Sequence, residues 1–291
     1  MGETIVIGLA NGGIYGLLAL GLVLVYKGSR VLNFAQGEIG GFGLYIAWAL
    51  IEKAGLPWVA GAAIAIVMCA VIGGIFERVV VRPMIDAPRL GITVATIAVL
   101  LFFAGLELKL WGTSPQILRP PIEGLGPEVF GFFVSPARML ALAAVIVIGT
   151  ALALFLRRTD FGLGVLAASQ DPSAVRLMGV PLARVSSFTW VAAGALSALA
   201  ALLIEPTIGV ISPGLMTRLF IPGLAAALLG GLTSLPGAFA GGLAIGVIES
   251  TVGYTFVDST FPGIDTVAVM LVIIAVLVVR PQGILGRAVA A

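Results

Sequence analysis

The sequence predicts an all-α integral membrane protein with about eight to nine membrane segments, including discontinuous or re-entrant helices. Of its 291 residues, 60% are hydrophobic and only 10% are charged, whereas soluble domains average about 25% charged residues. Long uncharged runs recur along the chain. Glycine (39) and proline (16) are also frequent, as expected where membrane helices pack closely or are interrupted at depth.

Five uncharged runs reach or nearly reach the length of about 20 residues that a helix needs to cross the hydrocarbon core. They are residues 4–26, 57–76, 90–106, 139–156 and 186–204. Residues 31–51 and 264–279 complete the set; the first contains three polar residues and the second begins beside an aspartate. Each of these runs is predicted to be a membrane helix.

Residues 219–248 are uncharged for longer than one span, but they contain the pair Gly230-Gly231 and then Pro236. Glycine and proline commonly mark turns. This stretch is therefore predicted to form a shorter helix, a tight turn and a full helix.

The positions of the cations predict the orientation, because lysine and arginine near span ends stay in the cytoplasm. Eleven of the sixteen lie at ends that alternate consistently: Lys27, Arg30, Arg78, Arg82, Arg89, Arg157, Arg158, Arg176, Arg184, Arg280 and Arg287. The N-terminus is then outside and the C-terminus cytoplasmic. The first run lacks a basic start and is too long for a cleaved signal peptide.

A span followed by a polar, glycine-rich break and another helix occurs twice. The break after residues 4–26 reads GSRVLNFAQGE, and that after 186–204 reads EPTIGVISPGLMTR. The charges place the two units in opposite orientations, as in inverted-repeat transporters; the alternative is chance recurrence of such breaks. The chain is predicted to be one domain, 1–291, with a first repeat and an extra span at about 4–156, a cytoplasmic loop at 157–185 and a second repeat at 186–280.

Polar side chains of both breaks are predicted to line a substrate path, because unsatisfied polar groups are costly in lipid. They are Asn33, Gln36, Glu38, Thr207, Ser212 and Thr217. For the first three the alternative is structural: they cap a re-entrant helix and hydrogen-bond a neighbour. Asn33 is a good N-cap, and Glu38 falls near a first turn, where the helix dipole favours an anion.

Three other acids lie near membrane depth. Glu205 is expected to be a solvated acid at the outer interface. Glu249 is expected to pair with Arg218 or to accept hydrogen bonds in the packed interior, in preference to binding a transported ion. Glu107, with Lys109, is expected to mark the outer end of its span and to have no chemical role.

The segment 157–184 is polar and rich in arginine, between two apolar runs. Within it, Asp171 and Pro172 are typical of a helix start, and Gly179 is typical of a helix end. We expect a short, capped helix that forms a docking surface; the alternative is a solvated connector.

Several function classes lose support. The single cysteine, Cys69, excludes an intramolecular disulfide, and the absence of histidine removes the usual metal ligands and catalytic bases. The net charge of +2 is too small to indicate nucleic-acid binding. No Gly-x-x-x-x-Gly-Lys-Ser/Thr motif is present, so the energy for transport would come from a gradient or a partner.

Six ordered stretches carry a resemblance to a known family: NGGIYGLLALGLVLVY at 11–26, LNFAQGE at 32–38, ERVVVRP at 77–83, FGLGVLAASQDPSAVRLMGV at 161–180, ALLGGLTSLPGAFAGGLAIGVIES at 227–250 and RPQGILG at 280–286. Over nearly its whole length the chain resembles the LivH-type permease subunits of branched-chain amino-acid ABC transporters. Gln36 stands where many relatives have histidine, which argues against any role that needs an imidazole there.

The resemblance implies an inverted-repeat ABC importer permease in the cell (inner) membrane. Its partners would be a second permease subunit, in a heterodimer, two cytoplasmic ATPase subunits and an extracytoplasmic substrate-binding protein, besides membrane lipid. The chain itself would be no enzyme and would hold no cofactor, ATP and Mg being bound by the ATPases. The residues expected at the ATPase contact are Asp171, Ala174, Arg176, Leu177, Met178 and Gly179.

The resemblance favours leucine, isoleucine or valine as cargo, although related permeases carry urea, short amides or other amino acids. A self-sufficient channel or secondary carrier is the alternative from another class. A membrane-embedded enzyme is disfavoured, because the sequence predicts no paired catalytic acids or metal ligands converging on one face.

Overall fold

The computed structural model describes residues 2–84, 87–122, 124, 126–129, 132–256 and 263–286; Arg287 lies outside them. The helices are α1 (Gly2–Ser29), α2 (Gln36–Trp48), α3 (Trp58–Phe76), α4 (Arg89–Trp111), α5 (Pro136–Arg158), α6 (Asp160–Ala168), α7 (Pro172–Leu177), α8 (Leu182–Ile208), α9 (Leu215–Gly230), α10 (Leu235–Thr255) and α11 (Ile264–Val279). Short π-helical segments, Ala49–Lys53 and Glu77–Val81, extend α2 and α3. The strands β1 (Glu128–Val129) and β2 (Phe132–Phe133) form a small hairpin.

The predicted all-α membrane class is confirmed. Within the described ranges, six helices are long and apolar enough to cross a membrane: α1, α3 with its π-helical extension, α4, α5, α8 and α10. The apolar helices α9 and α11 are shorter, at 16 residues each. The total of eight to nine membrane segments stays a prediction.

The predicted break within residues 219–248 is present. Helix α9 ends at Gly230, and Gly231 has a φ of 97°, a left-handed conformation that suits glycine. Ser234 then caps α10 by accepting a hydrogen bond from the backbone N–H of Gly237 at 3.1 Å, with Pro236 in the first turn.

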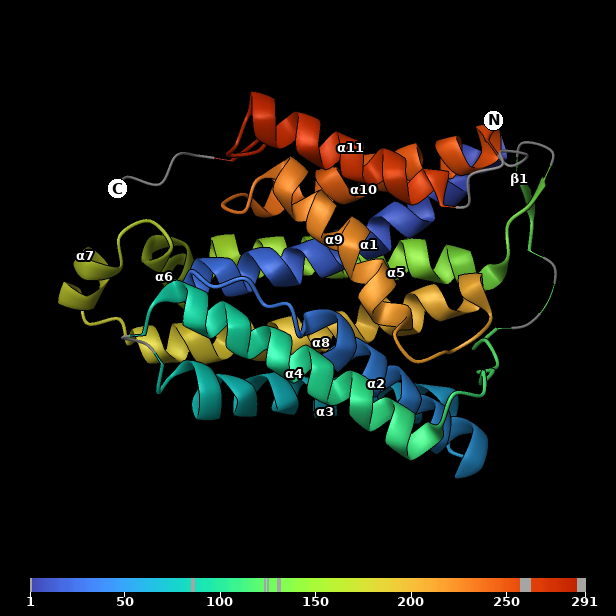
Figure 1. Ribbon diagram of the computed structural model, residues 1–291, viewed down its shortest axis with the longest axis horizontal. Coiled ribbons are helices and arrows are strands. Elements are labelled where there is room, and N and C mark those ends of the chain that lie inside the picture. Colours follow the sequence, from blue (N-terminus) through green and yellow to red (C-terminus); the bar gives the residue numbers. More distant parts are fainter. Residues whose placement is uncertain are drawn as a thin grey trace.

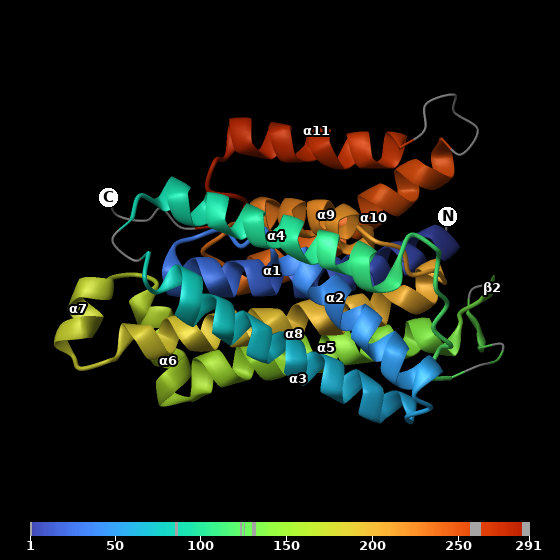
Figure 2. The same ribbon diagram turned by 60° about the horizontal axis from the view of Figure 1, so that its bottom comes forward.

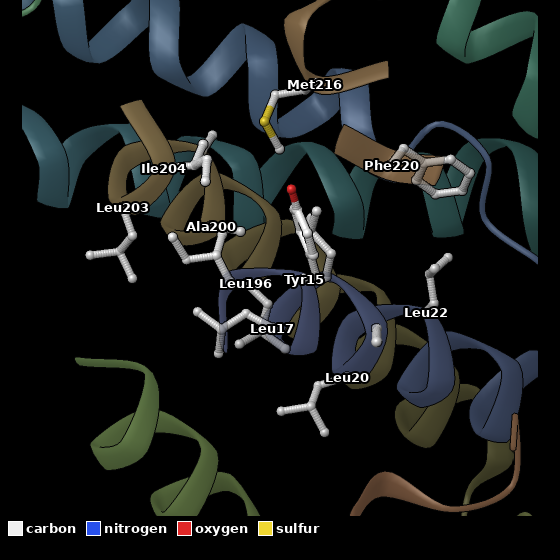
Figure 3. Packing of buried hydrophobic residues seen from close by; sticks show 14 of the residues in the cluster. Tyr15, Leu17, Leu20, Leu22, Leu196, Ala200, Leu203, Ile204, Met216 and Phe220 are labelled. Atoms are coloured by element: carbon white, nitrogen blue, oxygen red, sulfur yellow. The ribbon is translucent and has the colours of Figure 1, made fainter. Parts of the chain in front are cut away.

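Helices α1 and α8 run through the centre of the molecule (Figure 1). Of their most apolar stretches, 72% and 67% of residues are buried, against 22% in α4 and 17% in α5. The core between them is drawn in Figure 3 and includes Leu17, Leu20 and Leu22 of α1, Leu196, Ala200 and Leu203 of α8, and Met216 and Phe220 of α9. Large apolar side chains on α3, α4, α5 and α11 point outward, as lipid-facing surfaces require.

The two ends of the molecule differ. Helices α6 and α7 lie at one end, and the start of α1 and the β-hairpin lie at the other (Figure 1). Helix α11 runs along one side of the bundle (Figure 2), and its partners are α10 and α9.

Glycines bring α1 and α10 into backbone contact. A Cβ atom on Gly12 would lie 2.9 Å from Cα of Leu243, closer than real Cβ contacts. On the opposite side, α8 meets α3 in the same manner, since a Cβ atom on Gly194 would lie 2.9 Å from the carbonyl carbon of Cys69. Small residues permit this approach, which gives extensive dispersion contact where lipid supplies no hydrophobic driving force between helices.

We predict that Gly12→Ala destabilises the protein by about 1–3 kcal/mol, because the added methyl group must displace the backbone of α10. Gly105→Ala in α4 is the matched control, since a Cβ atom there meets no atom within 4 Å; it is expected to be neutral or to stabilise by about 0.5–1 kcal/mol. Thermal unfolding of both variants in detergent measures the difference. Equal melting temperatures would contradict the close packing of α1 on α10.

Candidate functional site

The first break lies between α1 and α2. Helix α1 ends at Ser29, and α2 begins at Gln36 with Ala35 as its N-cap residue and no side-chain cap. The expectation that Asn33 caps this helix is therefore wrong. A turn at residues 34–35 directs the backbone carbonyl of Asn33, and not its side chain, toward the N–H of Gln36 at 3.4 Å. Asn33 itself is buried.

Helix α2 is surrounded by other helices, and 11 of its 13 residues are buried. Its glycines face different neighbours: Gly37 faces α9, Gly40 faces α8, Gly41 faces α4 and Gly43 faces α3. A Cβ atom on Gly37 would lie 2.9 Å from the carbonyl oxygen of Met216, and one on Gly40 would lie 2.6 Å from that of Ser197. The glycines therefore let five helices meet within one short segment.

Gln36 fastens the start of α2 to its neighbours. Its Nε2 donates a hydrogen bond to the carbonyl oxygen of Leu18 in α1, at 2.9 Å, and the hydroxyl of Ser197 in α8 donates to its backbone carbonyl. Gln36 is fully buried. The chemistry at this position is thus amide hydrogen bonding between packed helices.

Glu38 joins the two broken helices. The Thr217 hydroxyl donates a hydrogen bond to Oε1 of Glu38, and the Thr217 backbone N–H lies near the same carboxyl group. Thr217 is the third residue of α9, so the carboxyl group lies at a helix N-terminus, where backbone N–H groups lack partners within the helix and favour negative charge. Two residues that were predicted to belong to the path, 179 positions apart, are thereby in contact.

Glu107 completes this cluster. It is 1% exposed in α4, four residues before that helix ends at Trp111; that it has no chemical role stays an expectation. Its carboxyl group lies near the backbone N–H of Gly214 and within reach of the Glu38 carboxyl group. Gly41 provides the space, since a Cβ atom there would lie 2.8 Å from Oε1 of Glu107. The structure thus brings two buried acids together, a pairing that the sequence did not predict.

The second break lies between two left-handed glycines, Gly209 (φ 75°) and Gly214 (φ 77°). Ile211, within it, exchanges backbone hydrogen bonds of 2.8 and 2.9 Å with Gln116, so the loop that follows α4 holds the break in place. Thr207 and Ser212 flank or lie in the break and are partly exposed. The structure brings Thr217, but neither of these two, to Glu38.

Two further acids differ from expectation. Glu205 is 1% exposed and is not a solvated interfacial acid, because the segment around Leu118 folds over the end of α8. Glu249 lies close to the Tyr15 hydroxyl of α1 and interacts with it. No ion pair links it to Arg218 among the described residues, so the expected pairing is wrong, and Glu249 contacts a polar group in the packed interior instead.

The predicted capped helix in the polar segment is confirmed as α7. Oδ1 of Asp171 accepts a hydrogen bond from the backbone N–H of Ala174 at 2.9 Å, and Gly179 follows the helix with a φ of 81°. Leu177 and Met178 are 90% and 80% exposed, and Arg176 is exposed beside them. The polar segment is shorter than expected, because residues 157–158 belong to α5 and residues 182–185 to α8, and it also contains α6.

Cations at the end of α1 hold this segment. Nζ of Lys27 donates a hydrogen bond to Oγ of Ser169 at 2.9 Å, and the Arg30 guanidinium donates to the carbonyl oxygen of Ser169. Ser169 lies between α6 and α7. The segment that carries α7 is therefore fastened to the residue that begins the first break.

The cluster offers no metal site of the usual kind. Within the described ranges, no three side chains of His, Cys, Asp or Glu come together as ligands. What the Glu38 cluster provides is two carboxyl groups, a hydroxyl group and backbone N–H donors.

We predict that Thr217→Val lowers stability by about 1–3 kcal/mol, because a buried carboxyl group loses a donor while the side-chain shape is kept. Thr93→Val is the matched control: among the described residues its hydroxyl bonds to the carbonyl of Arg89 in its own helix, in an exposed contact, so the expected change is within about 0.5 kcal/mol. Thermal unfolding in detergent compares the two. An equal loss in both variants would show that the Glu38 contact contributes nothing specific.

Comparison with known proteins identifies the family. The family described as "Branched-chain amino acid transport system / permease component" matches residues 4–279. The chain is 31% identical to the high-affinity branched-chain amino acid transport system permease protein BraD of Pseudomonas aeruginosa, over 98% of this chain and 95% of that one. It is also 31% identical to LivH of Escherichia coli (96% and 94% covered) and 30% identical to the probable LivH of Methanocaldococcus jannaschii (93% and 88%).

Among solved structures, the chain is similar to PsaBC from Streptococcus pneumoniae in complex with Fab, with a TM-score of 0.48, 15% identity and coverage of 94% and 89%. The near full-length family match and the relatives above 30% identity are decisive. The chain belongs to the family of permease components of branched-chain amino acid transport systems.

Proposed function

We propose that this chain is the membrane-spanning permease subunit of an ATP-driven importer and that its cargo is a branched-chain amino acid. The observation that carries the proposal is the contact of Glu38 with Thr217, which joins the starts of two broken helices in the interior of a multi-pass membrane protein of this family. The cargo is supported by the names of BraD and LivH, which describe permeases for branched-chain amino acids.

The path runs between two inverted halves, 4–156 and 186–280, in this proposal. The packing supports this division: α1 contacts α9 and α10 of the second half, and α8 contacts α2 and α3 of the first. The polar residues of the breaks line the path, namely Asn33, Gln36, Glu38, Thr207, Ser212 and Thr217. Gln36 and Glu38 are 0% exposed, so the path is closed here, and α2 must move relative to α9 to open it.

Helix α7 is the proposed contact with a cytoplasmic ATPase. Exposed Leu177 and Met178 form an apolar tip on a capped helix, with Arg176 beside them; such a tip in water is typical of a binding surface. The N-terminus then lies outside and the C-terminus in the cytoplasm. ATP and Mg belong to the two ATPase subunits, and Asp171, Ala174 and Gly179 shape the helix that meets them.

The hydrogen bonds from Lys27 and Arg30 to Ser169 connect the segment that carries α7 to the end of α1, so a displacement of α7 is transmitted to a membrane helix. A displacement of the α6–α7 connection pulls on the end of α1, where the first break begins. Transport then follows alternating access, in which ATP binding moves α7 and the two halves rock about the central contact. A second permease chain and an extracytoplasmic binding protein complete the complex.

Reconstitution tests the function. We expect vesicles that contain this chain with its co-purified ATPases, second permease and binding protein to accumulate leucine, isoleucine or valine only when ATP is supplied on the ATPase side. Vesicles that contain the chain alone are the control and are expected to be inactive. Uptake by the chain alone without ATP would instead establish a channel or secondary carrier.

A second experiment tests α7. Ala174→Pro removes the backbone N–H that donates a hydrogen bond to Asp171, and Arg176→Glu reverses the exposed charge. We expect the double variant to insert and to assemble less well with the ATPase, with uptake reduced more than tenfold and ATP hydrolysis no longer stimulated by cargo. Arg138→Glu is the control for a reversed charge far from α7, because Arg138 lies at the start of α5 and α6 and α7 follow its end. Normal uptake by the double variant would exclude α7 as the coupling element.

A further inference from the structure

We infer that Glu38 and Glu107 form a proton-binding site, in which the two carboxyl groups share one proton at the N-terminus of α9. This inference concerns a ligand other than the cargo and does not depend on which molecule is transported. It rests on burial, on the number of hydrogen-bond donors and on the absence of a neutralising cation.

The first step is the balance of charge. Glu38 and Glu107 are 0% and 1% exposed, and in the described part of the chain the ion pairs are Arg82 with Glu77 and Arg119 with Glu52. Neither glutamate of the cluster therefore has a basic partner there. Two adjacent ionised carboxylates without a cation would repel each other in a medium that screens poorly, so one of them must be neutral.

The second step is the set of donors. Glu38 accepts from the hydroxyl of Thr217 and lies near its backbone N–H, whereas Glu107 lies near the backbone N–H of Gly214 alone. These groups belong to the largely buried N-terminal turn of α9, whose dipole favours one negative charge. The better-supplied carboxyl, Glu38, is suited to the anion, which leaves the proton on the side of Glu107.

The third step concerns atoms that lack a donor. Oε2 of Glu38 and Oε1 of Glu107 receive no hydrogen bond from any other described group, although the two carboxyl groups lie within hydrogen-bonding reach of each other. Two carboxylate oxygens can only accept, so they cannot satisfy one another. With one proton between them, both buried oxygens gain a partner.

A fourth, independent observation comes from Tyr45. This residue is 1% exposed, its hydroxyl has no hydrogen-bond partner among the described groups, and it interacts electrostatically with both carboxyl groups. It lies two turns from Glu38 on the same helix, and its ring stacks on Trp111 of α4 at 4.8 Å. A further buried polar group thus lies on the same helix as Glu38, and again it brings no charge to neutralise the pair.

The shared proton has a mechanical consequence. Glu38 belongs to α2, Glu107 to α4 and the donors to α9, so one proton turns a repulsive meeting of three helices into an attractive one. The shared hydrogen bond joins α2 to α4, and the bond from Thr217 joins α2 to α9, so α2 cannot move away from both neighbours without breaking both bonds. The site therefore holds the two broken helices together in the closed arrangement.

Infrared spectroscopy of the full-length protein in lipid vesicles tests the site. A protonated carboxyl group has a carbonyl-stretching band, sensitive to deuteration, that a carboxylate lacks. We expect Glu107→Gln to lower the intensity of this band by the amount that one protonated carboxyl group contributes. The double variant Glu38→Gln/Glu107→Gln is expected to lower it by the same amount and no further. Glu205→Gln is the matched control: a buried glutamate of α8 outside the cluster, whose own contribution should add independently in either background.

Two results would overturn the site. If Glu107→Gln removes no band, both groups are ionised; if the double variant removes twice the intensity, they are two separate neutral acids. Should Glu107→Gln fail to fold, Gly41→Ala replaces it, because the new Cβ atom lies 2.8 Å from Oε1 of Glu107 and pushes the carboxyl groups apart. The band is then expected to shift in frequency, and an unshifted band would contradict sharing.

Discussion

The burial of α2 is the constraint on which the rest of the structure depends. This helix has 13 residues, fewer than the number needed to cross the hydrocarbon core, and it contacts α1, α3, α4, α8 and α9. A short helix can contact so many neighbours only if parts of its surface have no side chain. This is the case on four different faces, at Gly37, Gly40, Gly41 and Gly43. The price is a shortage of apolar contact area per residue. Polar contacts from Gln36 and Glu38 compensate by fixing the helix at its first turn.

The two breaks solve the same physical problem differently. A helix that begins within the membrane exposes backbone N–H groups that no water can reach, and each must find an acceptor. At α9 the carboxyl groups of α2 and α4 lie against the N-terminal turn, where Glu38 accepts from the Thr217 hydroxyl, and the N–H of Leu215 donates to the carbonyl oxygen of Ser212. At α2 the cap residue is Ala35, and the contacts that hold the turn are backbone carbonyls and the hydroxyl of Ser197. The first break is thus held by neutral groups, and the second by a cluster that also carries charge.

Features that depend on local composition could be predicted from the sequence. The uncharged runs predict the helices, the Gly230-Gly231 pair followed by Pro236 predicts the turn before α10, and Asp171 with Gly179 predicts α7. Features that depend on distant partners could not. The burial of Glu107 is one example: the uncharged run before it ends at Leu106, but α4 continues to Trp111, and Gly41 of another helix leaves space for the Glu107 carboxyl group. Glu205 is buried by a loop that begins some ninety residues earlier, and Asn33 loses its capping role to a turn that the residue types do not reveal.

Arg30 shows how a small local cost can identify a functional connection. At a φ of 58° it is the only non-glycine residue with a left-handed backbone in the described ranges, whereas Gly55, Gly112, Gly124, Gly179, Gly209, Gly214, Gly231, Gly263 and Gly283 occupy the other positive-φ positions. For a residue with a Cβ atom this conformation costs roughly 1–2 kcal/mol, which glycine would avoid. The side chain that glycine would lack is the one that reaches the carbonyl oxygen of Ser169. The strain at the end of α1 is therefore offset by a charged hydrogen bond to the segment that carries α7, and this bond joins the first break to the surface proposed to meet the ATPase.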